Sequence, residues 1–357
     1  MKVTSKDLSR LLTIMIVSKI LFSDINIFVK NSGSAAYMEA VLCAVSGIVI
    51  FLAISFFYKK IGCPDIFSSV EFSFGKIAKS VIGTLFFVLS TVYTALSLKL
   101  YADAIITIAY PNSHALYVMA FIVVTMLVTA YNGIDTVTKF CSVCLVSMLS
   151  LLVILYALTL KNADVSNLFP IFGGGAKSII FGVKNIYMYN EILFLFFLSG
   201  YLEKKEDASK VGIKAILISS AVIIASTFIY NLCVPYPVSK MFNMPLLQLA
   251  SSTEMDIFFQ RTEGIFFLLW IYSSFLYLGT SFYFTLYSFK KTYNSTDFKA
   301  LIPSLAVLIV IITAFFKSTD EVSRFYVTAT WIFSVFAFAV PFISFVTEYF
   351  KRRRKNA

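Results

Sequence analysis

Long apolar stretches constrain this chain more than any other feature of its sequence. We place ten of them, separated by short polar segments, at residues 8–29, 35–58, 81–109, 115–130, 136–160, 178–201, 211–234, 263–289, 301–316 and 327–349. A helix needs about 20 apolar residues to cross the ~30 Å hydrocarbon core of a bilayer. Because 59% of the 357 residues are hydrophobic, no segment is left for a separate soluble domain. The sequence predicts a single polytopic all-α membrane domain, 1–357, with about ten transmembrane helices.

The basic residues predict the orientation of these helices. An even number of spans places both termini on the same side. If that side is cytoplasmic, the inner segments carry 20 Lys and Arg residues and the outer segments carry 8. Cytoplasmic loops are usually enriched in Lys and Arg, so both termini are expected inside. The same bias explains the net charge of +11 without a nucleic acid partner, and the basic run 351–355 is interpreted as a topology signal that contacts membrane lipids.

Residues that usually carry enzymatic chemistry are sparse in this sequence. Cys141 and Cys144 form a CxxC pair, but the pair lies within a predicted helix and has no second pair, which favours core packing over metal or redox chemistry. The lone His114 cannot form a metal site by itself, and the sequence contains no nucleophile motif, Walker loop or zinc signature. We therefore expect neither an enzyme nor a bound cofactor or metal.

Charges inside the predicted spans are the most informative residues. Each costs roughly 2.5–3.5 kcal/mol at a helix centre on insertion scales. Lys19 lies midway along the first predicted helix and Glu191 midway along the sixth, and neither has a partner in its own helix. Lys99 and Asp103 are four residues apart in the third helix, so they can neutralise each other as a structural or a functional pair. Glu39 lies near the outer end of the second helix, where we expect it to reach water.

Ten helices can form two inverted repeats of five, and helices one and six would then correspond. Lys19 and Glu191 would meet near the membrane midplane. Both helices contain small or polar residues that disfavour a regular apolar helix: Ser18, Ser23, Asp24, Asn26, Gly182, Asn185 and Asn190. We therefore expect breaks in helices one and six beside a small wet pocket.

The candidate pocket residues come from four of the predicted helices. With Lys19 and Glu191 they are Ser18, Tyr93, Tyr187, Asn190 and Tyr277. An outward orientation of Glu191 is disfavoured because an unpartnered carboxylate is costly in lipid. The alternative is that Lys19 extends toward the membrane surface while Glu191 is protonated and hydrogen-bonded to a tyrosine.

Several motifs resemble those of a known family. NLFPIFGGG at 167–175, followed by Glu191, resembles the loop and Gly-Glu helix of the B subunits of GerA-type spore germinant receptors. The segment 244–270, with its early proline, an Arg-x-Glu pair at Arg261 and Glu263 and a later Trp, looks like the same family. SKILFSD at 18–24 is similar to the Lys-Leu-x-x-Leu-Pro-Ser form of helix one in some members. The resemblance covers the whole chain.

The chain departs from the family pattern at three places. It reads AYMEAV where the family often has Asp-Ala-Trp, it has Asn190 before Glu191 where the family has Gly, and it lacks the proline of the helix-one motif. These departures leave the fold expectation intact and the germinant open.

The resemblance implies an APC-superfamily fold, with a LeuT-like 5+5 inverted repeat and broken helices one and six. It also implies a receptor subunit of the spore inner membrane, assembled with a larger membrane A subunit and a C-subunit lipoprotein. Such a B subunit is expected to bind a small nutrient, commonly an amino acid, and to signal by a conformational change. The alternative is a proton- or sodium-coupled APC-type amino acid transporter, which would share the fold and the pocket. A structural scaffold would not need unpaired charges at the midplane.

The implied roles follow from these charges. Glu191 suits the ammonium group of an amino acid, and Lys19 suits its carboxylate or replaces a sodium ion in a cation site. Lys99 and Asp103 are assigned structural or gating roles. Arg261 and Glu263, at the outer mouth of helix eight, are interpreted as a surface anchor rather than as ligand contacts.

Overall fold

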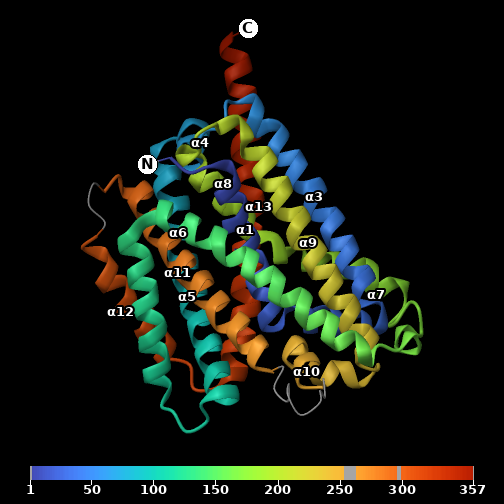
Figure 1. The fold of residues 1–357 in the computed structure, drawn as a ribbon. Helices are drawn as coiled ribbons and strands as arrows, with labels where there is room; N and C mark the ends of the chain where they lie inside the picture. Colours follow the sequence, from blue (N-terminus) through green and yellow to red (C-terminus); the bar gives the residue numbers. More distant parts are fainter. Residues whose placement is uncertain (1, 253–262, 296–298, 357) are drawn as a thin grey trace.

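The computed structural model describes residues 2–252, 263–295 and 299–356, which form helices joined by short loops (Figure 1). Seven helical segments in this part of the chain are long and apolar enough to cross a membrane: Ile25–Lys60, Lys76–Ala109, Ala115–Asn162, Ala176–Tyr201, Lys205–Cys233, Phe266–Tyr293 and Thr319–Lys355. A shorter apolar helix, Leu301–Ala314, precedes the last of them. The protein is an all-helical integral membrane protein, as its apolar stretches predict.

The α-helices and the irregular helical segments alternate along the chain. The α-helices of the first half are α1 (Ser5–Lys19), α2 (Ile25–Ser32), α3 (Ala36–Lys60), α4 (Ile66–Phe74), α5 (Lys76–Ala109) and α6 (Ala115–Thr159). Those of the second half are α7 (Ala176–Phe181), α8 (Leu193–Leu198), α9 (Ala208–Cys233), α10 (Pro245–Ser251), α11 (Glu263–Tyr293), α12 (Leu301–Ala314) and α13 (Thr319–Asn356). Short 3₁₀ segments join some of them: η2 (Gly33–Ala35), η3 (Leu160–Asn162), η4 (Val165–Leu168), η6 (Ser199–Tyr201), η7 (Lys205–Asp207) and η8 (Val238–Met241).

Several helices extend beyond the predicted apolar ranges. Helix α13 covers 38 residues, whereas the apolar pattern predicts only 327–349, because the polar residues at both ends are helical too. The predicted helices 115–130 and 136–160 form the two arms of α6, which are separated by a kink at Gly133, where the backbone is not helical. This glycine has a φ of 77°, in the left-handed region that glycine adopts at little cost. The two arms of α6 consequently run in different directions (Figure 1).

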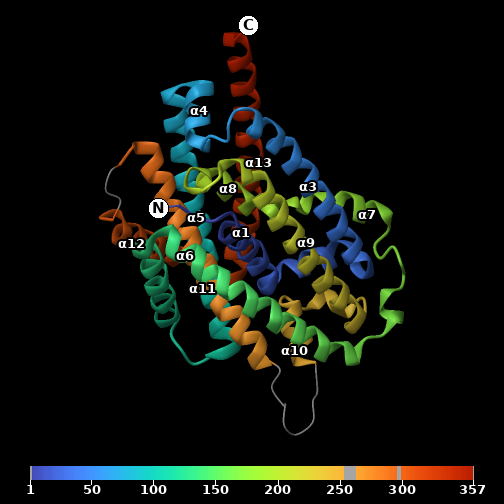
Figure 2. The ribbon, with the colours of Figure 1, turned by 45° about the horizontal axis from the view of Figure 1, so that its top comes forward.

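The first predicted helix is interrupted in its middle. Helix α1 ends at Lys19, a π turn, η1 (Ile20–Asp24), follows, and α2 then continues in the α conformation. Single π turns inside α-helices are frequent at functional sites. Every residue from 11 to 19 is buried, so α1 lies in the centre of the molecule, where it contacts α6, α9 and α11 (Figure 2). A helix that is buried all round belongs in the core.

The sixth predicted helix is interrupted as well. Helix α7 passes into the 3₁₀ segment η5 (Gly182–Ile192), which has 11 residues, and α8 follows. Runs of 3₁₀ helix longer than 3–4 residues are uncommon. The small and polar residues Gly182, Asn185 and Asn190 all fall in η5, where they disfavour the α conformation. Both interruptions are helical turns of a different pitch rather than extended breaks.

Both termini lie at the same end of the molecule, at the top of Figure 1. Near the N-terminus, the N–H of Val3 donates to the carbonyl of Tyr201 over 2.7 Å, which fixes the first residues beside the end of the interrupted sixth helix. Helix α10 and the first residues of α13 lie at the opposite end (Figure 1). We refer to the two ends as the terminal end and the far end.

Candidate functional site

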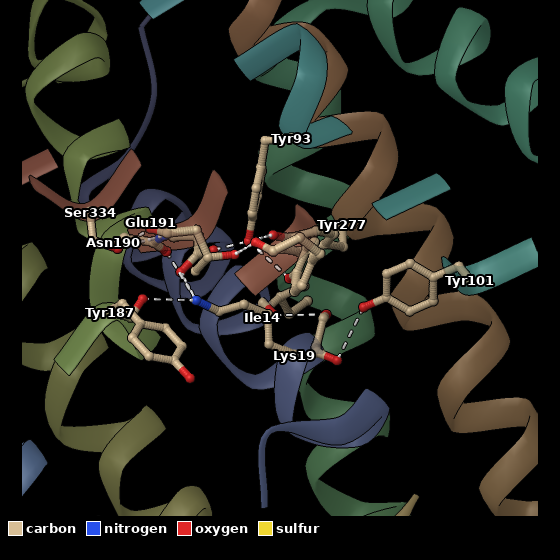
Figure 3. A network of polar contacts seen from close by, with 12 residues as sticks. Ile14, Lys19, Tyr93, Tyr101, Tyr187, Asn190, Glu191, Tyr277 and Ser334 are labelled. Atoms are coloured by element: carbon tan, nitrogen blue, oxygen red, sulfur yellow. Dashed lines mark hydrogen bonds and ion pairs between the residues drawn. The ribbon is translucent and has the colours of Figure 1, made fainter. Parts of the chain in front are cut away.

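Lys19 and Glu191 form an ion pair between the two interrupted helices (Figure 3). The Nζ atom of Lys19 lies 2.6 Å from Oε2 of Glu191, and the side chains are only 3% and 1% exposed. Lys19 is the last residue of α1, directly before the π turn, and Glu191 is the penultimate residue of η5. The structure thus brings together the two midspan charges that have no partner in their own helices.

The Lys19 ammonium has three acceptors around it. Besides the Glu191 carboxylate, it donates to Oδ1 of Asn190 over 3.0 Å and to the backbone carbonyl of Tyr187 over 3.3 Å. An ammonium group has three N–H donors, and the two hydrogen bonds and the ion pair of Lys19 all involve residues of η5. Asn190 in turn donates from Nδ2 to the hydroxyl of Ser334 on α13 over 3.3 Å, which links the pair to a third element.

A chain of tyrosine hydroxyls continues from Glu191 (Figure 3). Tyr277 of α11 donates to Oε1 of Glu191 over 3.3 Å, and its hydroxyl lies 2.6 Å from that of Tyr93 on α5. The Tyr93 hydroxyl lies 3.1 Å from that of Tyr326 on α13. The Tyr93 ring stacks on Phe333 with an interplanar angle of 4°. Four helical elements therefore converge on this buried carboxylate.

Ser18 points away from the ion pair. Its hydroxyl donates to the carbonyl of Ile14 over 2.8 Å and to that of Ser273 over 3.3 Å, so it connects α1 to α11. Its own carbonyl accepts from the Tyr101 hydroxyl over 3.4 Å. Among the described residues, Ser18 therefore makes no contact with the Lys19 and Glu191 side chains, and Tyr93 reaches Glu191 only through Tyr277.

A cavity of about 650 Å³ extends from Lys19 toward the far end of the molecule. Its lining includes Thr319, the first residue of α13, and its charged and amide residues are Lys19, Asp24, Asn26, Lys30, Asp103, Asn243 and Asp320. Lys30 and Asp320 are exposed, whereas Asp24 is only 4% exposed. Tyr187 also lines this space, but Glu191, Asn190, Tyr93 and Tyr277 lie in the layer behind Lys19. The ion pair thus closes the inner end of the cavity.

Sequence reasoning missed Asp24, Tyr326 and Ser334 as members of this site. Asp24 was considered only as a residue that disfavours a regular helix, although it is a third charge five residues after Lys19 in the same apolar stretch. A third charge so close to Lys19 in an apolar stretch was the sequence signal that could have identified Asp24 as a site residue. Tyr326 and Ser334 lie on α13, where nothing in the sequence distinguishes them from other polar residues of a long helix.

Lys99 and Asp103 form the ion pair that their spacing predicts, with 2.9 Å between Nζ and Oδ1. The second oxygen of Asp103 accepts from the Thr319 hydroxyl over 3.0 Å, which joins α5 to the start of α13 beside the cavity. Arg261 lies outside the described residues. For Glu263 the structure describes only its place as the first residue of α11. The surface anchor at these two positions stays a prediction.

Glu39 does not reach water, and this expectation was wrong. Its side chain is fully buried and accepts from Asn31 over 2.8 Å, from Asn185 over 2.6 Å and from the hydroxyl of Ser32. The close approach depends on Gly182, because a Cβ atom there would overlap the Glu39 carboxylate. Glu39 instead joins α2, α3 and η5, because these short polar side chains satisfy it inside the molecule.

Comparison with known proteins places these features in context. The profile of the family described as "Spore germination protein" matches residues 2–347. The chain is 23% identical over 345 residues to "Spore germination protein KB" of Bacillus subtilis (strain 168), covering 91% of this chain and 90% of that protein. It is 22% identical over 317 residues to "Spore germination protein A2" of the same organism, covering 85% of each.

A solved structure shares the arrangement of the helices. It is that of Mhp1, a nucleobase-cation-symport-1 family transporter, in a closed conformation with bromovinylhydantoin bound. The two structures align with a TM-score of 0.63 over 92% of this chain and 75% of the transporter, at 11% sequence identity. At that identity the likeness concerns the fold alone.

Proposed function

This chain belongs to the spore germination protein family, as its motifs indicate, and from that membership we propose that it is the nutrient-binding membrane subunit of a spore germinant receptor. The observation that carries the proposal is the 650 Å³ cavity that ends on the Lys19 and Glu191 pair. Ligand sites are commonly concave and contain a few placed polar groups. The nutrient is proposed to occupy this cavity against the inner ion pair.

The proposed architecture has ten spans in two inverted halves. The spans α1–η1–α2 and α7–η5–α8 would be the corresponding broken helices one and six. Transporters with such repeats hold their ligands near the membrane midplane, beside discontinuous helices. The interruptions after Lys19 and before Glu191 support this proposal, as does the fold likeness to Mhp1.

The proposed location is the spore inner membrane, with both termini on the cytoplasmic side. The 20-to-8 distribution of basic residues supports this orientation, and so does the position of both termini at the same end of the molecule. The far end, with the cavity, would face outward. Nutrient would then reach Lys19 from outside the membrane.

The proposed partners are a larger membrane A subunit and a C-subunit lipoprotein. Their assembly with this chain follows from the resemblance to B subunits of GerA-type receptors. Signalling requires that nutrient binding in the cavity change the conformation of another protein. In this proposal that protein is a partner subunit. Membrane lipids contact the apolar faces, and we propose no nucleic acid partner.

The proposed mechanism is a conformational change biased by the ligand. Helices α1 and η5 are joined by the ion pair, and an aromatic layer lies on its terminal side, where Phe194 and Phe284 stack with their centroids 3.7 Å apart. The protein is proposed to exist in two conformations, and a ligand shifts the equilibrium between them only by its differential affinity for the two. Moving the population from 1:99 to 99:1 needs roughly 5.5 kcal/mol, which the partner subunits would share.

A second candidate function is amino acid transport coupled to protons or sodium. The fold likeness to a cation symporter and the cavity that ends on a buried lysine favour it. The arrangement of genes separates the two proposals, because adjacent genes for A and C subunits favour the receptor. Uptake of labelled amino acids by vesicles that contain only this chain would favour the transporter.

The test of the proposed function is the germination of spores that lack this gene. Such spores, exposed to a panel of single amino acids, sugars and salts, are expected to lose the response to at least one nutrient. Complementation with the wild-type gene should restore that response. A deletion strain that responds to every nutrient at wild-type concentrations would contradict the proposal.

A further inference from the structure

Asp24 is a buried carboxylate without a partner at the cavity wall. It ends the π turn η1 and lines the cavity, and its side chain is 4% exposed. Within the described residues it makes neither a hydrogen bond nor an ion pair. Burying a charge without a partner is costly, so a site that retains one is expected to receive an opposite charge from elsewhere.

The charges near Asp24 act on it without pairing with it: Lys19 attracts its carboxylate and Glu191 repels it, and no ion pair forms with either among the described residues. The three N–H donors of Lys19 are directed to Glu191, Asn190 and Tyr187. At the cavity mouth, Asp103 is paired with Lys99. Lys30 and Asp320 remain, with opposite charges and exposed side chains that water solvates. The buried inner end of the cavity, formed by Lys19, Glu191 and Asp24, therefore carries a net charge of −1 when all three are ionised.

A second acceptor lies two residues farther along the chain. Oδ1 of Asn26 is buried without a hydrogen bond partner, and Asn26 lines the same cavity. Its side chain is 6% exposed. Both unfilled groups are acceptors, so an occupant that satisfies them must bring donors. An ammonium group brings three donors and a positive charge, which matches a carboxylate and an amide oxygen.

We propose that Asp24 and Asn26 bind the ammonium group of an amine-bearing nutrient, on the far side of the Lys19 and Glu191 pair. This inference rests on the proposed function and assigns the substrate class of that cavity. It gives the ammonium to Asp24 rather than to Glu191, because Lys19 already occupies Glu191. The volume of about 650 Å³ and the apolar lining by Ile27, Leu100 and Val327 fit an organic amine rather than a bare inorganic cation.

The test compares Asp24→Asn with wild type in spores that lack the chromosomal copy. The probes are L-alanine, glycine and L-valine, each paired with the 2-hydroxy acid in which a hydroxyl replaces the ammonium group. The readout is the concentration that gives half-maximal germination, with the amount of the chain in the inner membrane measured by immunoblot. Wild-type spores should respond to ammonium-bearing compounds and not to the matched hydroxy acids.

Asp24→Asn should raise the half-maximal concentration roughly tenfold to a hundredfold, the usual effect of losing a charge-assisted hydrogen bond. Glu321→Gln is the matched control. Glu321 lies in the first turn of α13, near the cavity mouth, but it does not line the cavity. Its effect should stay within about threefold, because Glu321 is partly exposed to water and lies outside the cavity lining. Asn26→Leu provides a second variant in case Asp24→Asn fails to accumulate, and it should shift the response in the same direction.

Three results would overturn the assignment. The first is a wild-type response by Asp24→Asn spores that contain normal amounts of the chain. The second is an equal response of wild-type spores to the amino acids and their hydroxy acids. The third is a germination response that requires sodium or potassium in wild-type spores but not in Asp24→Asn spores, while both respond to the amino acids and not to the hydroxy acids. A normal response of the deletion strain itself would refute the proposed function, whereas a normal Asp24→Asn response against a silent deletion refutes only the role of Asp24.

Discussion

At the scale of single residues, the charge on Lys19 organises the centre of the molecule. Its ammonium is held by a carboxylate, an amide oxygen and a backbone carbonyl, all from η5. A buried pair of this kind stabilises little relative to an apolar pair, because desolvation offsets the attraction. Removing one partner alone is much more costly, since the other charge is left buried. The pair is therefore sensitive to single substitutions.

We expect Lys19→Met and Glu191→Gln each to destabilise the protein by about 3–5 kcal/mol. The double variant should be less destabilised than the sum of the two, with a coupling energy of about 0.5–3 kcal/mol, because no charge is left without its partner. Thermal unfolding in detergent measures the stability of the purified wild-type protein, the two single variants and the double variant. Strictly additive effects would show that the two charges do not interact.

The nutrient sensitivity of spores tests the role of Glu191 separately from its effect on stability. Glu191→Gln keeps the shape and the hydrogen-bonding capacity of the side chain but removes its charge. We expect the half-maximal nutrient concentration to rise roughly tenfold or more while the chain still accumulates in the membrane. Immunoblotting of inner membranes controls for abundance. Spores that respond at the wild-type concentration would make Glu191 a structural carboxyl.

At the scale of elements, the two interruptions and the contacts of Glu39 hold the site in place. Glu39 ties the start of α3 to Asn31 of α2 and to Asn185 of η5. This contact requires glycine at position 182, where η5 begins. Packing against a residue without a side chain lets the carboxylate lie against the backbone of the 3₁₀ segment. The far halves of both interrupted helices thereby share a buried hydrogen-bonding group.

Gly182→Ala tests this arrangement. The added methyl group would overlap Glu39, so we expect a loss of stability of about 1–3 kcal/mol, typical of overpacking. Gly200→Ala is the matched control, because nothing lies within 4 Å of a Cβ atom at that position. Thermal unfolding of both variants measures the difference. Equal stability of the two would mean that Glu39 moves aside without cost.

Sequence reasoning identified the interrupted helices but not their internal geometry. The midspan charges Lys19 and Glu191 were recognisable because lipid penalises them wherever they lie. The burial of Glu39 was not, since its partners come from helices that are distant in sequence, Asn185 among them. Asp24 was visible as a charge, but its lack of a partner is a property of the packed molecule. Pairings across helices require the fold, whereas charges within a span can be read directly.

At the scale of the whole molecule, the position of the two ends bears on the proposed orientation in the membrane. The termini lie toward the same end of the molecule (Figure 1). The cavity lining includes the first residues of α13, which lie at the opposite end. The proposed orientation places the basic terminal end in the cytoplasm. This orientation and the proposed assembly with partner subunits lead to two measurements.

Cysteine-accessibility labelling tests the orientation. Cysteines introduced at Lys2 and Lys355 should be shielded from a membrane-impermeant reagent in intact cells, whereas a cysteine at Lys317, just before α13, should be labelled. The five native cysteines are buried or partly buried, and the unmodified chain provides the background. Labelling of Lys2 and Lys355 from opposite faces would refute the ten-span arrangement.

Dependence on partners tests the proposed assembly. We expect the chain to accumulate poorly, or to remain silent, in spores that lack the A and C subunits, because a receptor subunit is stabilised by binding its partners. Immunoblotting and germination assays in single-gene deletions measure both effects. A nutrient response from this chain alone in a heterologous membrane would contradict the assembly.

Helix α13 connects the two ends of the molecule as a lever arm. The residues of its first turns line the cavity. Its last turns project past the body of the molecule (Figures 1 and 2). Its 38 residues span about 57 Å at 1.5 Å per residue. For an arm of that length, a tilt of about one degree at the cavity displaces the tip by about 1 Å. Pro341 lies within the helix and marks the point where such an arm would bend.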